Sequence, residues 1–453
     1  VFTMRIVIKI GTSTLTHATG RLNIRRVEQL CKTIADLKNA GHEIILVSSG
    51  AIGVGLRRMD LAKRPKHLPA AQALAAIGQC RLMSLWDSLF EQLRQPIAQI
   101  LLTRNDIADR SQYLNAVNTM HALLEMEVIP IVNENDPLAV SEIKFGDNDT
   151  LSAITAAMVH ADYLFLMTDV DCLYDSNPRT NPNAKAIEVV DDIDALRVDV
   201  SSKGSSLGTG GMSTKIVAAR LAASAGVTTV IAKSTNPKNI FSIVQYIQSL
   251  GLPRNKSLSG AMFKDLSVSQ AQAPSDDLAD TPKETHIGEQ VEKPLHTRFT
   301  PNKHPIRDRR FWLLHGLAAH GTVYIDAGAE KALTSKAGLL PVGVVDVEGH
   351  FSSHEAVRIC VVERIPQTSA TVGEGSGTGD GKLWRGTPRE IGRALVNYSD
   401  KEIMQIKGLQ SGGIHKVLGY SDTEYVALRD NISLDVKMSR PVSPTAEHSV
   451  LDI

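Results

Sequence analysis

The sequence predicts an α/β protein: a three-layer αβα sandwich with a mainly parallel sheet, followed by a small β-rich domain. In the first half of the chain, short apolar runs alternate with stretches of helical spacing that end at a glycine. These runs are apolar on both faces, which is typical of parallel strands covered by helices on both sides. From about residue 306 onward, glycine turns separate the apolar segments, which indicates a β-rich domain.

Six apolar runs are the expected strands of the first domain. They span residues 5–10, 43–49, 97–103, 128–134, 163–169 and 228–234. Between them, residues 23–41 and 212–226 have helical spacing. This alternation of strand and helix is the pattern of an α/β sandwich. In the second domain, the expected strands lie within residues 321–329, 343–349 and 356–363.

Changes in composition suggest the domain boundaries. We expect a catalytic domain at residues 1–252 and a β-rich domain at 306–432. The segment between them, 253–305, is polar, poor in aromatic residues and rich in Pro, Asp and Glu, so we expect a disordered linker. Residues 368–382 form a glycine-rich, flexible insertion between two strands, and residues 433–453 form a loose tail.

Composition and charge exclude several classes of protein. The 453 residues include 49 lysines and arginines and 49 aspartates and glutamates, so no net field attracts nucleic acid or an anionic membrane. The four cysteines form no C-x-x-C pair, which argues against a zinc ribbon or a redox dithiol. No apolar stretch approaches the roughly 18 residues of a membrane helix, and the N-terminus resembles no signal peptide. We therefore expect a soluble, cytoplasmic protein.

Lys9 interrupts an expected buried strand. The segment Ile6–Ser13 is IVIKIGTS, and a lysine is costly in such a run unless an anion meets it. One interpretation is that Lys9 reaches phosphate oxygens while Gly11 lets the backbone approach them closely. The alternative is a lysine at the strand end that extends into water.

Two loops after later strands have the composition of ligand-binding turns. In residues 48–55, SSGAIGVG, backbone N–H groups can hold an anion, although the glycine order is not the dinucleotide fingerprint. In residues 133–140, NENDPLAV, amides and carboxylates follow one another, which suits the ammonium end of a zwitterion. A tight strand–helix turn and an Asx-turn are the respective alternatives.

Two helix starts carry further polar groups. Asp147, Asn148 and Asp149 precede a clear helix that needs only one of them as an N-cap. The two residues that do not serve as the N-cap can hold a substrate amine, orient a lysine or reach a metal ion. Residues 208–215, GTGGMSTK, combine flexible backbone donors with Lys215 at a helix start, which suits phosphate, without the order of a Walker loop. A mobile surface loop is the alternative.

All these loops follow strands, at the edge of a parallel sheet where ligands bind. Two lysines, two glycine loops and a carboxylate cluster at one edge indicate phosphoryl transfer from a nucleotide, because cations and backbone donors stabilise the charge that moves. The sequence has no Walker loop and no protein-kinase H-R-D or D-F-G set.

Six segments within residues 5–249 resemble, in order and spacing, the amino acid kinase family: KIGTS, VSSGAIGVG, IVNENDPLAV, FGDNDTLSA, LMTDVDCLY and GTGGMSTK. Within it, the likeness is to the enzymes that phosphorylate L-glutamate in the first step of proline synthesis. The β-rich segment resembles a PUA domain (pseudouridine synthase and archaeosine transglycosylase) through AHGTVYIDAGAEKAL, LLPVGVVDVEGHF and GLQSGGIHKVLGY.

The resemblance implies L-glutamate and ATP as substrates, Mg²⁺ as cofactor and L-glutamyl 5-phosphate as product. The catalytic residues that it implies are Lys9, Lys215 and Asp149, with unknown metal ligands. The substrate-binding residues that it implies are Ser49, Gly50, Ala51, Asp136, Asp147 and Asn148. The nucleotide-binding residues that it implies are Lys9, Thr168, Asp169, Thr209, Gly210, Gly211, Met212, Ser213, Thr214 and Lys215.

The resemblance further implies proline as a feedback inhibitor and a homo-oligomer, either a dimer or a tetramer. It leaves nucleic-acid binding through the PUA domain open, and Asn302–Arg310 is the one short basic run near that domain.

Cys172 stands where many family members have glycine, and the linker and insertion exceed the bacterial pattern, as in a fungal-type enzyme. The rival functions are a kinase for aspartate, acetylglutamate, carbamate or uridylate, and an RNA-binding protein acting through the PUA segment.

Overall fold

The computed structural model describes residues 3–16, 22–61, 63–139, 148–178, 180–193, 195–196, 211–249, 293–302, 305–306, 308–365, 384–420 and 423–435. The chain forms two compact units. The first contains Val1–Thr103 and Leu114–Pro305, and the second contains Arg104–Tyr113 and Ile306–Ile453. Among the described residues, no helix combines the length and the apolar character needed to cross a bilayer.

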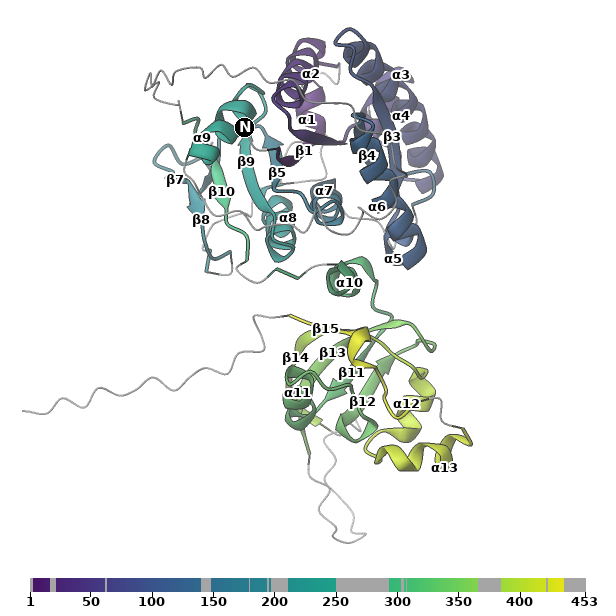
Figure 1. Ribbon diagram of the computed structural model, residues 1–453. Coiled ribbons are helices and arrows are strands. Elements are labelled where there is room, and N and C mark those ends of the chain that lie inside the picture. The colour runs from purple at the N-terminus through teal and green to yellow at the C-terminus, as the bar shows by residue number, and fades with distance from the viewer. Residues whose placement is uncertain are drawn as a thin grey trace, which may run out of the picture. The chain divides into compact units, whose positions relative to one another are not determined.

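The first unit is built on an eight-stranded sheet with the order β3-β4-β2-β1-β5-β9-β10-β8 (Figure 1). The strands are β1 (Arg5–Ile10), β2 (Glu43–Ser48), β3 (Ile97–Leu102), β4 (Ile129–Glu134), β5 (Tyr163–Thr168), β8 (Val189–Val190), β9 (Thr228–Lys233) and β10 (Thr297–Phe299). All neighbouring pairs are parallel except β9 and β10. A separate hairpin pairs β6 (Leu173–Tyr174) with β7 (Ala186–Ile187).

Helices cover both faces of this sheet. They are α1 (Thr12–Leu15), α2 (Ile24–Asn39), α3 (Ala51–Arg58), α4 (Leu68–Glu91), α6 (Arg110–Glu125), α7 (Asn148–Met158), α8 (Met212–Ser224) and α9 (Asn239–Ser249). The short helix α5 (Arg104–Ala108) and the first residues of α6 belong to the second unit. Every second side chain of β1, from Ile6 to Ile10, joins a core with α2, α4 and α9. The alternate side chains, including Lys9, point to the opposite face, where α7 packs against β1. The strand period therefore turns Lys9 toward the start of α7.

The end of the predicted linker belongs to the first unit. Thr297–Phe299, inside the segment expected to be a linker, forms β10 and pairs with both β9 and β8. Thr297 is fully buried, and its hydroxyl accepts from the backbone N–H of Leu173 at 2.7 Å. Because this strand has only three residues, no alternating pattern reveals it. Residues 253–292 lie outside the described part of the chain.

The second unit is built on a five-stranded sheet with the order β12-β11-β13-β14-β15. Its strands are β11 (Gly321–Ile325), β12 (Val344–Gly349), β13 (Ala356–Arg364), β14 (Trp384–Leu395) and β15 (Ile432–Leu434). Its helices are α10 (Asp308–Phe311), the π-helical turn Trp312–Gly316, α11 (Ala327–Thr334), α12 (Asp400–Ile406) and α13 (Ile414–Leu418), with three 3₁₀ turns at Pro341–Gly343, Ser411–Gly413 and Arg429–Asn431. A capping box between Ser399 and Glu402 begins α12.

An early segment of the chain joins this second unit, which the predicted boundaries do not anticipate. Arg104–Tyr113 belongs to it, and the indole N–H of Trp312 donates to the carbonyl of Ile107 at 2.8 Å. The guanidinium of Arg110 lies over the ring of Trp312, 5.3 Å from its centroid. These contacts are a buried hydrogen bond and a cation–π pair, neither of which leaves a sequence pattern.

The predicted fold class is confirmed: a mainly parallel sheet between helices, and a separate β-rich unit. All six predicted strands of the first domain are present, and so are the three predicted for the second. The predicted insertion at 368–382 and most of the predicted tail at 433–453 lie outside the described residues.

Candidate active site

Polar side chains gather at the carboxyl edge of the parallel sheet in the first unit. Lys9 is near the end of β1, Ser48 ends β2 and is followed by Ser49, and Asn133 is near the end of β4. The first turn of α7 brings Asn148 and Asp149 to the same edge. This is the edge where parallel α/β sheets bind ligands.

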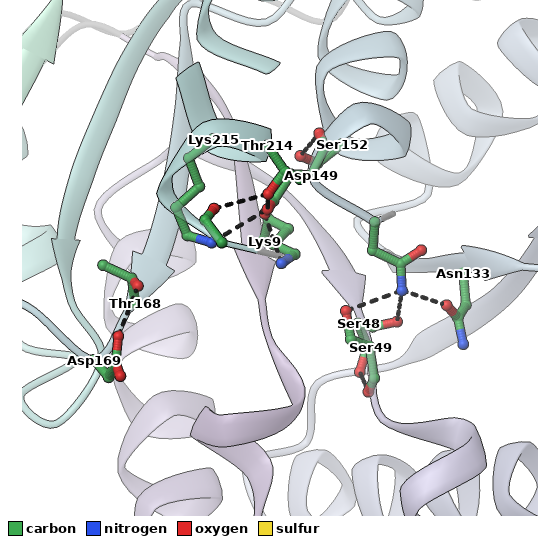
Figure 2. Close-up of polar contacts among 12 residues, drawn as sticks. Lys9, Ser48, Ser49, Asn133, Asp149, Ser152, Thr168, Asp169, Thr214 and Lys215 are labelled. Carbon is green, nitrogen blue, oxygen red and sulfur yellow. Dashed lines mark hydrogen bonds and ion pairs between the residues drawn. The ribbon is translucent and has the colours of Figure 1, made fainter. Parts of the chain in front are cut away.

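Lys9 and Lys215 meet at one carboxylate (Figure 2). Lys9 Nζ lies 2.6 Å from Oδ1 of Asp149, and Lys215 Nζ lies 3.2 Å from Oδ2. The two lysines are 206 positions apart in sequence (215 − 9) and come from β1 and α8. Asp149 is completely buried, and the two lysines are 5% and 6% exposed. The cluster therefore carries one net positive charge in a site with little water.

The surroundings of Asp149 keep its carboxylate ionised. Burial favours the neutral acid, but the charges of Lys9 and Lys215 outweigh it and hold the pKa of Asp149 at about 2. The position in the first turn of α7 also favours an anion. The hydroxyl of Thr214 adds a hydrogen bond to Oδ2 at 2.7 Å. Asp149 is thus a permanent anion that holds two ammonium groups in place.

The start of α8 delivers Lys215 to the site. Gly211, in an extended conformation, precedes the helix as its N-cap, and Thr214 Oγ1 also lies 2.8 Å from the carbonyl of Gly211. Met212 and Ser213 occupy the same first turn, and Ser213 is exposed. Free backbone N–H groups at such a helix start attract anions. The predicted residues Thr209 and Gly210 lie outside the described part of the chain.

A second cluster beside the first consists of neutral groups (Figure 2). The side-chain Nδ2 of Asn148 donates to Ser49 Oγ at 2.9 Å and to Asn133 Oδ1 at 3.0 Å, and it lies 3.4 Å from the carbonyl of Ser48. Asn133 in turn donates to Oε1 of Gln79 at 2.7 Å. The side-chain oxygen of Asn148 is buried, and no donor among the residues that the structure describes reaches it. A buried acceptor without a donor is costly, so this oxygen is the atom of the cluster that a ligand can satisfy.

The turn after β2 has a conformation that requires glycine. Gly50 has φ = 102° and precedes α3 as its N-cap, and this φ lies in the left-handed region that side chains disfavour. The N–H groups of the first turn, from Ala51 onward, have no partner inside the helix. The turn predicted at 48–55 is therefore both a strand–helix connection and a potential anion site.

Thr168 and Asp169 lie at the end of β5, away from both clusters in Figure 2. The hydroxyl of Thr168 donates to the carboxylate of Asp169 at 3.2 Å. Beside them, the Nζ of Lys233 contacts both carboxylate oxygens of Asp171 at 2.9 and 3.1 Å. The register of the sheet pairs Thr168 with Lys233, so these side chains form one polar rim.

The structure brings most of the predicted site residues to one sheet edge. Asp136 follows β4 and is half-buried, and its carbonyl accepts from Ala139. Asp147 lies outside the described residues. The sequence missed two residues of the neutral cluster, Gln79 and Asn133. Asn133 belongs to the predicted loop 133–140, where its amide was an available signal, whereas Gln79 is in the middle of α4, where nothing in the sequence distinguishes it.

Comparisons with known proteins identify the family of the chain. The model of the "Amino acid kinase family" matches residues 4–233, and the PUA domain model matches residues 321–418. A protein of Schizosaccharomyces pombe named "Probable glutamate 5-kinase" is 50% identical over 432 residues, which cover 94% of this chain and 92% of the relative. A "Glutamate 5-kinase" of Cyanothece sp. is 42% identical, covering 95% of this chain and all of the relative. An uncharacterised protein of Saccharomyces cerevisiae is 44% identical over 94% of this chain and 97% of its own length.

A family model that matches just over half of the chain and relatives that cover nearly all of it lead to the same assignment. The chain belongs to the amino acid kinase family, and a PUA domain follows its kinase fold.

Proposed function

We propose that this protein transfers the γ-phosphoryl group of ATP to the γ-carboxylate of L-glutamate, forming L-glutamyl 5-phosphate and ADP, the first step of proline biosynthesis. The observation that carries the proposal is the convergence of Lys9 and Lys215 on Asp149 in a buried site. Relatives named glutamate 5-kinase supply the identity of the substrate.

The chemistry requires charge stabilisation and no proton transfer. A γ-carboxylate oxygen forms a bond to the γ-phosphorus of ATP, and the bond from that phosphorus to the ADP oxygen breaks. Both reactants are anions, so their repulsion is a main part of the barrier. Lys9 and Lys215 supply positive charge on the transferring group, where low water content makes each charge effective.

Asp149 acts through the two lysines. Its ion pairs fix the direction of both ammonium groups before substrates bind, so no reorganisation is needed at the moment of transfer. It also offsets part of their charge, which a buried site without a counter-ion does not tolerate.

The neutral cluster is the proposed site for the amino-acid end of glutamate. The buried oxygen of Asn148 accepts no hydrogen bond from the described residues, so it suits the α-ammonium group as a partner. Ser49 accepts from the same amide, and the family likeness adds Asp136 and Asp147 to the proposed site. The backbone of Gly50 and Ala51, at the start of α3, suits a carboxylate.

We assign the nucleotide to the groups around Thr168 and Asp169 and to the start of α8. The first turn of α8, from Met212 to Lys215, presents backbone N–H groups and one ammonium group, the chemistry that phosphate oxygens need. The loop 209–211 before it is assigned by the family likeness.

The fit of the described residues to Mg²⁺ is poor. No group of three or more His, Cys, Asp or Glu side chains among them can hold a metal ion, and both oxygens of Asp149 face lysines. A nucleotide-bound Mg²⁺ needs only one or two protein carboxylates and takes its other ligands from phosphate and water. We therefore derive no step from a metal ligand of this protein.

A substrate panel tests the proposal. The protein is incubated with ATP, Mg²⁺ and hydroxylamine, and with L-glutamate, L-aspartate, N-acetylglutamate, carbamate or uridylate in separate reactions. We expect ADP release and a trapped hydroxamate with L-glutamate, at a kcat/KM far above that with the other acceptors. Preference for another acceptor would replace the substrate assignment, and ADP release without hydroxamate would contradict carboxylate phosphorylation.

Four further predictions accompany the proposal: proline as a feedback inhibitor, a homo-oligomer, a cytoplasmic location, and a PUA domain that can contact nucleic acid. The balanced charge of the chain gives little support to the last of these. A gel shift with structured RNA that weakens steeply with salt would support it, and equal weak binding to any polyanion would not.

A further inference from the structure

A chain of hydrogen bonds connects the middle of α4 to the neutral cluster. Gln79 Oε1 accepts from Asn133 Nδ2 at 2.7 Å, and Asn133 Oδ1 accepts from Asn148 Nδ2 at 3.0 Å. Gln79 is 9% exposed and Asn133 is 2% exposed, so little water is available to replace either bond. The residue at the start of this chain has no role in the function proposed above.

Backbone groups fix the direction of every bond in the chain. The N–H of Glu134 can only donate, and it donates to Asn133 Oδ1 at 2.9 Å. The NH₂ group of Asn133 must therefore face Gln79, which must present its oxygen. At the other end, the carbonyl of Ser48 can only accept, so it requires the nitrogen of Asn148. The Asn148 oxygen is consequently the atom left for a ligand.

The same stretch of α4 also fixes the turn after β2. A Cβ on Gly78, the neighbour of Gln79, would lie 1.7 Å from the carbonyl oxygen of Ala51. A Cβ on Gly55 of α3 would lie 1.9 Å from the carbonyl of Leu74 of α4. The backbones of α3 and α4 are thus in direct contact, as only glycine permits. Two adjacent residues of α4 position both sides of the proposed amino-acid site.

We propose that Gln79 is a positioning residue for the amino-acid substrate: it accepts from Asn133 and so keeps the side-chain oxygen of Asn148 directed at the α-ammonium group. This inference rests on the proposed function, because it takes the substrate to be L-glutamate, whose α-ammonium group would contact Asn148. Without the Gln79 acceptor, the buried NH₂ of Asn133 has no partner, and turning that amide removes the acceptor from Glu134 and Asn148.

The arrangement also predicts selectivity for an amine. A site with an unsatisfied acceptor discriminates strongly against an analogue that lacks the donor. Glutarate has both carboxylates of glutamate and no ammonium group. We expect the wild-type protein to use glutarate at least a hundredfold less efficiently than L-glutamate, by kcat/KM, in the hydroxamate assay.

Three variants test the role of Gln79. Gln79→Leu removes the acceptor at similar volume, Gln79→Glu keeps an acceptor, and Gln92→Leu makes the same change at the exposed end of α4. For Gln79→Leu we expect the KM for L-glutamate to rise by up to about tenfold, no more than the loss of the Asn148 acceptor itself, with kcat changed less than about threefold. Gln79→Glu and Gln92→Leu are expected to stay within about threefold of wild type.

The glutarate control separates positioning from a structural defect. If Gln79 acts on the ammonium contact, Gln79→Leu leaves the KM for glutarate nearly unchanged, so selectivity for glutamate falls. In an Asn148→Ala background, Gln79→Leu has no further effect on the KM for glutamate. Should Gln79→Leu fold poorly, Gln79→Met, which also lacks the acceptor, replaces it in both comparisons.

Several outcomes would overturn the inference. They are an unchanged KM in a folded Gln79→Leu protein, equal rises for glutamate and glutarate, and additive effects with Asn148→Ala. Equal use of glutarate and glutamate by the wild-type protein would also contradict it, while leaving carboxylate phosphorylation intact. Absence of any glutamate-dependent hydroxamate contradicts the proposed function itself, which makes the two failures distinguishable.

Discussion

The two units of this protein each enclose basic side chains, fully buried in the first and half-buried in the second, and accommodate them in different ways. In the first unit, the ammonium groups of Lys9 and Lys215 both contact the buried carboxylate of Asp149. In the second unit, the imidazole of His315 interacts with the guanidinium groups of Arg393 and Arg104. Among the described residues, Asp149 is the one fully buried carboxylate, so the second cluster has no equivalent of it.

The pKa values reflect this difference. Asp149 has a pKa of about 2, because its two lysines outweigh the effect of burial. Burial, with a further contribution from Arg393 and Arg104, lowers the pKa of His315 to about 4. A buried carboxylate favours the charged form of the cations that contact it, whereas an imidazole whose charged neighbours are guanidinium groups loses its proton more readily. At neutral pH the imidazole of the second cluster is therefore uncharged.

Removing Asp149 is expected to have the largest effect. Asp149→Asn leaves two buried ammonium groups without a counter-charge, so we expect the free energy of unfolding to fall by about 3–5 kcal/mol. Urea unfolding monitored by circular dichroism measures this free energy. The control is Asp36→Asn on the exposed side of α2, whose free energy of unfolding should stay within about 0.5 kcal/mol of wild type.

The difference in the free energy of unfolding between wild type and Asp149→Asn should change with pH in one direction only. A carboxylate with a lowered pKa stabilises the fold fully above its unfolded value of 3.8, and this stabilisation is lost as the pH falls through about 2. The difference in the free energy of unfolding between wild type and Asp149→Asn should therefore be constant above pH 5 and become smaller below pH 4. A gap that widens on acidification would show that Asp149 is not ionised in the folded protein.

Loss of either lysine should affect turnover more than binding. Lys9→Met and Lys215→Met keep the aliphatic stem and remove the charge, and we expect each to lower kcat by a factor that corresponds to roughly 2.7–4 kcal/mol. The KM for glutamate should change little. Lys32→Met on exposed α2 is the matched control. Near-normal kcat in both buried-lysine variants would contradict the roles assigned to them.

The pH dependence of stability tests the assignment of His315 in the second unit. Its folded pKa of about 4 lies below the ordinary value of 6.5, so the unfolded chain binds a proton between these values and the fold does not. Stability of the second unit should therefore rise with pH from about 4 to 6.5, by on the order of 2–3 kcal/mol. His315→Gln should flatten this rise. An NMR titration of the His315 ring with a midpoint near 6.5 would refute the account.

The smallest expected effect belongs to the neutral cluster. Asn148→Ala removes one uncharged acceptor, so we expect the KM for glutamate to rise about tenfold, equivalent to about 1.4 kcal/mol, with kcat nearly unchanged. Steady-state kinetics of the hydroxamate reaction measure both constants. A larger fall in kcat than in affinity would assign Asn148 to the transfer step and remove the distinction between the charged and the neutral cluster.

The members of the charged cluster could be predicted from the sequence because each lies within or at the start of a recognisable element. Lys9 interrupts an apolar strand, and Asp149 and Lys215 lie in the first turns of helices. Parallel strands align such positions at one edge, so sequence order alone predicts that they meet. The distances and the sharing of one carboxylate by both lysines required the structure.

Apart from Asn133, which lies in the predicted loop 133–140, the remaining features have no local signal. Gln79 and Asn133 are 54 positions apart, and a buried glutamine inside a helix resembles a surface glutamine in sequence. The strand β10 is too short to show a period, and the packing of Arg104–Tyr113 in the second unit depends on tertiary contacts. Long-range pairing of this kind is what local patterns do not encode.

The central claim, that a glutamate oxygen attacks phosphorus beside Lys9 and Lys215, has a direct isotopic test. The protein is given ATP and L-glutamate labelled with ¹⁸O in the γ-carboxylate, and hydroxylamine captures the acyl group. The released phosphate is then analysed by ³¹P NMR. If glutamate is the nucleophile, the phosphate of the wild-type reaction carries one ¹⁸O, and its formation slows at least a hundredfold in the Lys9→Met and Lys215→Met proteins. Unlabelled phosphate at the full rate of ADP release would mean that water attacks ATP, which contradicts the account.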